Sequence, residues 1–157
     1  MPIATPATRA LDLLNLPYRL FKHSRLPASL EEAARQRGED PAQVIRSILF
    51  RLQPEVFVMV LTAGPGQISW KRVRAHLAVS RLSMATETEV HQFTGYETGT
   101  VNPLGLPHPI RILVDESVFQ PDEISIGCGV RGAAIILRSA DLREALGQVE
   151  IGIFSQP

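Results

Sequence analysis

The order of helical and strand-like patterns in this 157-residue sequence predicts an α+β protein with a mixed, mostly antiparallel sheet. Helical signals predominate at the start of the chain, a hairpin-like pair of strands follows, and strands cluster in the C-terminal third. This order differs from the regular alternation of strand and helix that is typical of parallel α/β sheets. It therefore disfavours a Rossmann-type dinucleotide-binding fold.

Capping signals divide the N-terminal third into short elements. Ser29 and Glu32 have the spacing of a capping box, and Gly38 can end the helix that they begin. Asp40 before Pro41 combines a preferred N-cap with a proline at the first helical position. The expected elements are a helix between Pro6 and Leu16, a strand over 18–22, a helix from Ser29 to Gly38 and a short helix over 41–46.

The middle of the chain predicts the centre of the sheet. The β-rich runs 47–52 and 56–62 are separated by Gln-Pro-Glu, which favours an antiparallel hairpin with a buried second strand. Further along, capping residues and strand-like runs alternate with a long glycine- and proline-rich loop. The expected elements are helices over 69–78, 86–95 and 139–146, strands over 110–114, 123–126 and 133–137, and an edge strand within 149–154.

The composition is that of an ordinary globular chain. A hydrophobic content of 45% with 20% charged residues excludes the disordered class, and the length predicts a single domain over 1–157. Acids and bases balance at sixteen each, so any nucleic-acid contact must come from a local basic patch. A lone cysteine, Cys128, together with the lack of a signal peptide or long apolar span, predicts a soluble, cytoplasmic protein without membrane contact.

The segment from Thr94 to Gly105, T-G-Y-E-T-G-T-V-N-P-L-G, is the principal candidate for a functional site. Long connections without regular structure are usually functional or disordered, and prolines at 103, 107 and 109 stiffen this one. Its glycines allow positive φ or close backbone approach. Such a loop can present backbone N–H groups to an anion or a carbonyl oxygen. The alternative is a structural crossover without a ligand.

Two other segments carry weaker signals. The glycine cluster over 127–132 is either a hairpin turn or a site where Arg131 meets a phosphate, and it lacks the features of a P-loop. Lys71, Arg72 and Arg74 form a basic helical segment that suits a phosphate backbone or is simply a solvated face. The four histidines and one cysteine show no metal-ligand spacing, so we expect no metal and no cofactor.

Four segments in this order carry a family resemblance: D-P-A-Q-V-I-R-S-I-L over 40–49, G-Q-I-S-W-K-R-V over 66–73, the loop over 94–105, and G-C-G-V-R-G over 127–132. They resemble the YbaK-like family of aminoacyl-tRNA deacylases, which is similar to the editing domain inserted in bacterial prolyl-tRNA synthetases. The resemblance implies a partly barrel-like mixed sheet with flanking helices. It also implies hydrolysis of wrongly charged tRNA, often tRNA(Pro) bearing alanine or cysteine, and a possible partnership with prolyl-tRNA synthetase.

The resemblance also implies roles for individual residues. The family's G-x-x-x-P loop, matching 99–103 here, holds the aminoacyl ester at the 3′ end of tRNA. Because such an ester is already activated, backbone donors and a positioned water or ribose hydroxyl can suffice for hydrolysis. Catalytic roles are expected for Gly99, Thr100 and Arg46, and tRNA contacts for Lys71, Arg72 and Arg74. Substrate contacts are expected for Phe21, His23, Asn102, Pro103, Gly127 and Arg131, and Arg46 is also expected to bind the terminal adenosine phosphate.

Three positions depart from the family pattern. Arg46 replaces a lysine, the loop reads Gly-Thr-Val-Asn-Pro instead of Gly-Gly-x-Ser-Pro, and Val130 replaces a lysine before Arg131. A planar guanidinium is larger than an ammonium and binds differently. Arg46 therefore motivates a second hypothesis, a non-catalytic protein that binds tRNA ends or a small ligand, and an amino-acid-sensing interaction module is a third. The sequence leaves the edited amino acid, the tRNA and the oligomeric state open.

Overall fold

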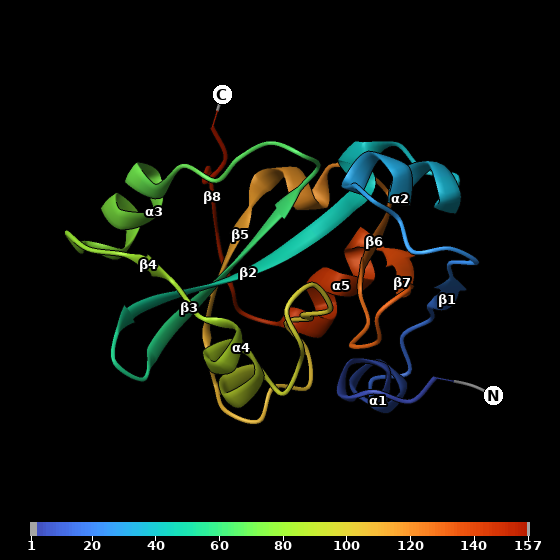
Figure 1. Ribbon diagram of the computed structural model, residues 1–157, viewed down its shortest axis with the longest axis horizontal. Helices are drawn as coiled ribbons and strands as arrows, with labels where there is room; N and C mark the ends of the chain where they lie inside the picture. The colour runs from blue at the N-terminus through green and yellow to red at the C-terminus, as the bar shows by residue number, and fades with distance from the viewer. Residues whose placement is uncertain (1–2, 157) are drawn as a thin grey trace.

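The computed structural model describes residues 3–156, which build five α-helices and one eight-stranded sheet (Figure 1). The helices are α1 (Pro6–Leu13), α2 (Leu30–Arg37), α3 (Trp70–Leu77), α4 (Glu87–Thr94) and α5 (Ser139–Leu146), with 3₁₀ turns η1 (Pro41–Gln43) and η2 (Glu116–Phe119). The strands are β1 (Arg19–Lys22), β2 (Val44–Gln53), β3 (Val56–Ala63), β4 (Ser83–Met84), β5 (Arg111–Asp115), β6 (Glu123–Gly127), β7 (Ala133–Arg138) and β8 (Glu150–Gly152).

The strand order is β1-β7-β6-β2-β3-β5-β8, with β4 pairing separately with β2. Four pairs are antiparallel, namely β1–β7, β6–β7, β2–β3 and β2–β4. Three pairs are parallel, namely β2–β6, β3–β5 and β5–β8. Within residues 3–156 the edge strands β1 and β8 do not pair with each other, so the sheet is open. The predicted α+β class with a mixed sheet is confirmed.

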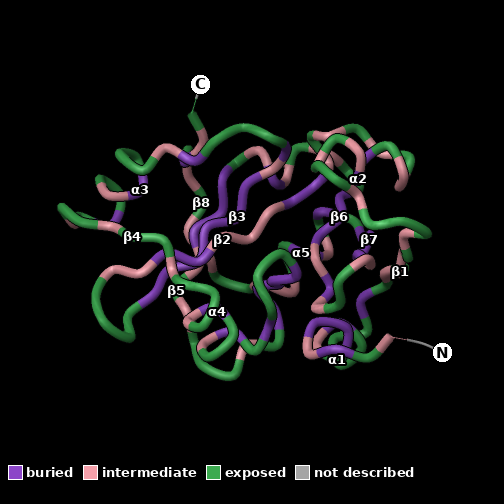
Figure 2. Tube along the Cα trace, viewed as in Figure 1, coloured by how far each residue is buried: buried purple, intermediate pink, exposed green. Residues whose placement is uncertain are grey.

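Strand β2 contributes to two hydrophobic clusters because its side chains alternate between the two faces of the sheet. Phe50 belongs to the cluster under α3, whereas Ile45 and Leu49 belong to the larger cluster that also receives α1, α4 and α5. Figure 2 shows the buried positions concentrated along β2, β3 and β5. The central hairpin therefore separates α3 from the other packed helices, a division that places the site described below.

The predicted N-caps are present, but Glu32 accepts the Ala28 N–H and not that of Ser29, so α2 lacks the reciprocal half of its predicted capping box. The Ser29 hydroxyl accepts a hydrogen bond from the Glu32 N–H at 3.1 Å, and Thr86 and Glu89 form a reciprocal capping box before α4. Gly38 and Gly95 end α2 and α4 in the left-handed region, with φ values of 72° and 78°. Each such N-cap stabilises its helix by about 1 kcal/mol. No helix among the described residues is both long enough and apolar enough to cross a bilayer.

The prediction of a short helix over 41–46 is wrong beyond the first turn. Its capping box is present, but only Pro41–Gln43 is helical, as a 3₁₀ turn, and β2 begins at Val44. Val44 and Ile45 pair with β6, so their β-branched side chains are buried in the sheet instead of continuing the helix. As a result Arg46 lies on a strand. The sequence patterns also missed β4 and η2, and the expected strand within 149–154 is limited to Glu150–Gly152.

Candidate functional site

A gap in the sheet exposes part of the edge of β2. Strand β6 pairs with β2 only at Val44 and Ile45, and β4 pairs with it only from Phe50 onward. A cavity of about 400 Å³ lies against the unpaired stretch between them. The Leu49 carbonyl accepts the Ala85 N–H at 3.1 Å on this edge, so alternation directs the peptide groups of Ser47 to the same edge. The cavity therefore offers backbone N–H and C=O groups to a ligand.

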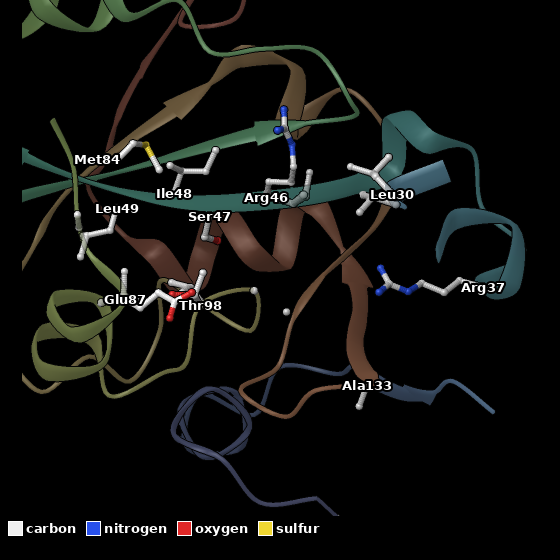
Figure 3. A pocket seen from close by; sticks show the side chains of 17 residues that line it. Leu30, Arg37, Arg46, Ser47, Ile48, Leu49, Met84, Glu87, Thr98 and Ala133 are labelled. Atoms are coloured by element: carbon white, nitrogen blue, oxygen red, sulfur yellow. The ribbon is translucent and has the colours of Figure 1, made fainter. Parts of the chain in front are cut away.

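Aliphatic and polar side chains both line the cavity, among them Leu49 and Ser47 from β2 (Figure 3). Four of the aliphatic residues are buried in the larger hydrophobic cluster and make up what we call the apolar base of the cavity, namely Ile45, Leu49, Val90 and Val101. Polar side chains come from Arg37, Arg46, Ser47, Glu87 and Thr98. The Ser47 hydroxyl oxygen is buried and has no hydrogen-bond partner within residues 3–156. An unsatisfied hydroxyl facing a cavity is a candidate ligand contact, because leaving it unpaired costs free energy.

The loop over 95–105 is held in place by hydrogen bonds along its whole length. The Tyr96 hydroxyl donates to the Leu104 carbonyl at 2.6 Å, and burial raises the pKa of Tyr96 to about 12. The Asn102 side chain donates to the Gly127 carbonyl at 2.7 Å and accepts the Leu104 N–H at 2.8 Å. The Gly129 N–H donates to the Thr100 carbonyl at 3.0 Å. These contacts connect the loop to the end of β6 and the turn after it.

Gly99 and Gly127 serve different purposes at this loop. Gly99 has a φ of 90°, and a Cβ added there would have no atom within 4 Å, so its conformation requires glycine although the space does not. A Cβ on Gly127 would lie 3.0 Å from the Thr100 carbonyl carbon and oxygen, so β6 supports the loop from below. Within the described chain the Gly99 N–H has no hydrogen-bond acceptor. Because Gly99 is exposed and lines the cavity, this N–H can donate to water or to an oxygen atom of a ligand.

The other predicted residues of the loop are buried in it. Thr100 and Asn102 are only 4% and 1% exposed, and the Thr100 hydroxyl donates to the Glu97 carbonyl at 2.8 Å. Pro103, next in the chain, is also buried. The polar groups of Thr100 and Asn102 are used within the protein, where they fix the loop that contains Gly99. Direct contact of Thr100, Asn102 or Pro103 with a substrate stays a prediction.

Arg46 lines the same cavity, but its guanidinium is held elsewhere. Its Nε donates to the Gly64 carbonyl at 3.0 Å and an amino group donates to the Gly66 carbonyl. Figure 3 shows the head group pointing away from Ser47 and Thr98. Burial lowers the pKa of Arg46, yet an arginine remains protonated in a protein. The structure thus does not bring this guanidinium together with the loop, and its catalytic role stays a prediction.

A second cavity of about 240 Å³ lies beside the first and holds two more of the predicted residues. His23 and Arg131 line it together with Gly99 and Thr100. Phe21 packs edge-on against the His23 ring, with 4.9 Å between the ring centroids. Phe21 therefore supports His23, and three predicted residues line this cavity together with Gly99, namely His23, Thr100 and Arg131.

The basic residues of α3 lie apart from this arrangement. Helix α3 packs on the Phe50 cluster, on the sheet face opposite Leu49 and Val90. The Arg72 guanidinium donates to the Ser155 carbonyl at 3.0 Å, whereas Lys71 is exposed. The structure does not bring Lys71, Arg72 and Arg74 to the Gly99 loop. A contact between α3 and a more distant part of a tRNA stays a prediction.

Four polar residues of the cavity were not named individually from the sequence, namely Arg37, Ser47, Glu87 and Thr98, although Thr98 lies within the predicted loop over 94–105. Thr98 and Ser47 directly precede or follow predicted residues, so chain proximity was an available signal. Arg37 had no such signal, because its position depends on hydrogen bonds to His23 and to the distant Ser125. Within residues 3–156, no cluster of three or more His, Cys, Asp or Glu could hold a metal ion.

The chain is similar in sequence to several known proteins. The sequence model of the aminoacyl-tRNA editing domain matches residues 27–145. The uncharacterized protein YwhH of Bacillus subtilis is 30% identical over 117 residues, covering 74% of each chain. The proline–tRNA ligase of Bacillus licheniformis is 33% identical over 96 residues, which are 61% of this chain but only 17% of the ligase.

Solved structures show the same fold across almost the whole chain. The hypothetical protein APE2540 superposes with a TM-score of 0.85 at 22% identity, covering 97% of this chain and 100% of that one. A protein proposed as a trans-editing enzyme for prolyl-tRNA synthetase gives a TM-score of 0.84 at 22% identity, covering 99% and 100%. This likeness shows the fold, and the match of the editing-domain sequence model to more than half of the chain shows that the chain belongs to the aminoacyl-tRNA editing domain family.

Proposed function

We propose that this protein edits mischarged aminoacyl-tRNA in trans by hydrolysing the ester that joins the amino acid to the terminal ribose. The observation that carries the proposal is the Gly99 N–H, which lacks an acceptor within the described chain and lies at a cavity with an apolar base. Membership of the editing-domain family supports the same reaction. The similarity to prolyl-tRNA ligases favours tRNA(Pro) as the substrate.

The proposed reaction needs no covalent intermediate with the protein. The ester carbonyl oxygen accepts the Gly99 N–H, which stabilises the negative charge that develops on that oxygen during attack. A water molecule adds to the carbonyl carbon, the bond to the ribose oxygen breaks, and that oxygen takes up the proton lost by the water. The products are a free amino acid and a tRNA with an intact terminal ribose. Positioning alone contributes much of the rate, since the ester is already activated.

The apolar base of the cavity is the proposed site for the amino-acid side chain. Ile45, Leu49, Val90 and Val101 provide it, and no polar group among these four could select a particular functional group. Such a surface discriminates by size and shape, at about 1–3 kcal/mol per methylene. We therefore propose a small non-cognate amino acid, such as alanine or cysteine, as the group removed.

Arg46 favours a second candidate function, that of a non-catalytic protein that binds tRNA ends or a small ligand. Its guanidinium binds the carbonyls of Gly64 and Gly66 and is turned away from Thr98. If catalysis requires a cation at the loop, this residue does not supply it in the present arrangement. The cavity itself would still hold a ligand.

A panel of aminoacyl-tRNAs distinguishes the two functions. Purified protein is incubated with alanyl-, cysteinyl-, seryl- and prolyl-tRNA(Pro), and the ester remaining is followed over time. We expect faster loss of at least one small non-cognate ester than in buffer, and no such gain with prolyl-tRNA(Pro). Buffer-rate hydrolysis of every member would refute the enzymatic proposal. Binding of deacylated tRNA in the same samples would then support the second function.

A further inference from the structure

The two cavities share a boundary at which Arg37, Gly99 and Ala133 line both of them. The larger cavity is mainly aliphatic, whereas the smaller one also contains His23 and Arg131. An aminoacyl ester has a matching division, with an amino acid on one side of the reacting carbon and a nucleotide on the other. The boundary is therefore a natural position for the ester, beside Gly99.

Arg37 is fixed at this boundary by two hydrogen bonds. Its Nε donates to His23 Nε2 at 3.1 Å, and its Nη1 donates to the Ser125 hydroxyl at 2.9 Å. Because an arginine can only donate, His23 Nε2 must accept, and His23 carries its proton on Nδ1. That nitrogen lies 2.6 Å from Gln36 Oε1, which accepts a hydrogen bond from it. The guanidinium is thus held in a defined orientation before any ligand binds.

The charge of Arg37 lacks a close counter-ion. Among the described residues no carboxylate lies within 4.0 Å of its guanidinium, and burial lowers its pKa. Glu39 attracts it from a longer distance, but burial raises the pKa of that carboxyl group. Its Nη2 amino group has no acceptor within residues 3–156, and Figure 3 shows the head group extending into the cavity. A desolvated cation with unused donors favours an anionic ligand.

We infer that Arg37 binds the phosphate of the 3′-terminal nucleotide, whose nucleoside occupies the smaller cavity while the aminoacyl group occupies the larger one. This inference rests on the proposed editing function. It assigns to Arg37 the phosphate contact that the sequence suggested for Arg46, whose guanidinium is already bound to the carbonyls of Gly64 and Gly66. Arginine suits this task because its planar fork matches phosphate oxygens. Arg37 acts here in binding, not in the chemical step.

The test compares Arg37→Gln with Arg35→Gln, a matched control because Arg35 is exposed on the same helix. Adenosine 5′-monophosphate and adenosine are titrated into each protein and binding is followed by NMR. We expect wild type and Arg35→Gln to bind the monophosphate at least tenfold more tightly than adenosine, as charge-assisted hydrogen bonds imply. Arg37→Gln should lose this preference, and Arg37→Lys should keep part of it.

Failure of the inference is distinguishable from failure of the proposed function. If wild type shows no preference for the monophosphate, or if folded Arg37→Gln binds the monophosphate as tightly as wild type does, Arg37 is not the phosphate site. In active protein, Arg37→Gln should raise KM for aminoacyl-tRNA much more than it lowers kcat. If instead wild type hydrolyses no aminoacyl-tRNA, the editing function fails, even where Arg37-dependent binding of the monophosphate is observed. Circular dichroism establishes folding, and Ser125→Ala, which removes only one support of the guanidinium, provides a milder variant.

Discussion

Replacing Asn102 with alanine separates a positioning role from direct contact with substrate. The side chain is 1% exposed and makes two hydrogen bonds, to the Gly127 carbonyl and from the Leu104 N–H. Alanine leaves both of these backbone groups unpaired, and each unsatisfied buried group costs about 1–3 kcal/mol. Allowing for some access of water, we expect a loss of about 2–4 kcal/mol in the free energy of unfolding. In a domain of this size that corresponds to a fall in Tm of roughly 4–16 °C.

The measurement combines thermal unfolding with deacylation of a small non-cognate aminoacyl-tRNA. If Asn102 positions Gly99, the Tm and kcat of Asn102→Ala fall together, because the loop loses its connection to β6. Gln92→Ala, at an exposed position on α4, provides the control and should leave both unchanged. An unchanged Tm with abolished hydrolysis would refute this reasoning. Asn102 would then be a substrate contact, as the family resemblance implies.

Three further predictions address other parts of the molecule. Gly99→Ala should lower kcat at least tenfold while costing only about 1–2 kcal/mol in stability, since its φ of 90° is strained for alanine but no atom obstructs the methyl group. Arg46→Lys should raise the deacylation rate if the family lysine acts at the loop, and a rate equal to wild type would show that this position does not limit hydrolysis. The hydrogen bond from Arg111, then that from His76, lowers the pKa of Glu150 to about 2. Because the folded pKa is depressed, its stabilising effect is present above about pH 4.5 and disappears towards pH 2. Glu150→Gln should therefore lower Tm at pH 7 but not at pH 2, and an equal difference at both values would contradict the ion pair.

Much of the local structure was predictable because it depends on neighbouring residues. Ser29, Thr86, Gly38 and Gly95 mark helix ends through contacts within one turn, and all four act as predicted. The short helix over 41–46 failed for the opposite reason. Its capping box is a local feature, but the burial of Val44 and Ile45 against β6 is a long-range one and outweighs it.

The candidate site divides in the same way. The position of Gly99 was predictable because a glycine in a long loop stiffened by prolines indicates a backbone conformation, here a φ of 90°, that other residues rarely adopt. The sequence predicted that Arg46 lies at the site, but it did not predict the direction in which its side chain points. Once β2 begins at Val44, strand alternation puts Arg46 and Ser47 on opposite faces, and the hydroxyl of Ser47 is the one buried at the cavity.

By itself the sequence determined the α+β class, most of the helix termini and the position of the Gly99 loop, because backbone propensity and capping act over a few residues. Only the tertiary structure decided that β6 and β4 leave a gap along β2, since strand pairing joins segments far apart in the chain. The same holds for Arg37, which reaches Ser125 across 88 positions of sequence. A cation at the end of a helix has no visible partner in the sequence, and only folding places it beside Gly99 at the boundary of two cavities.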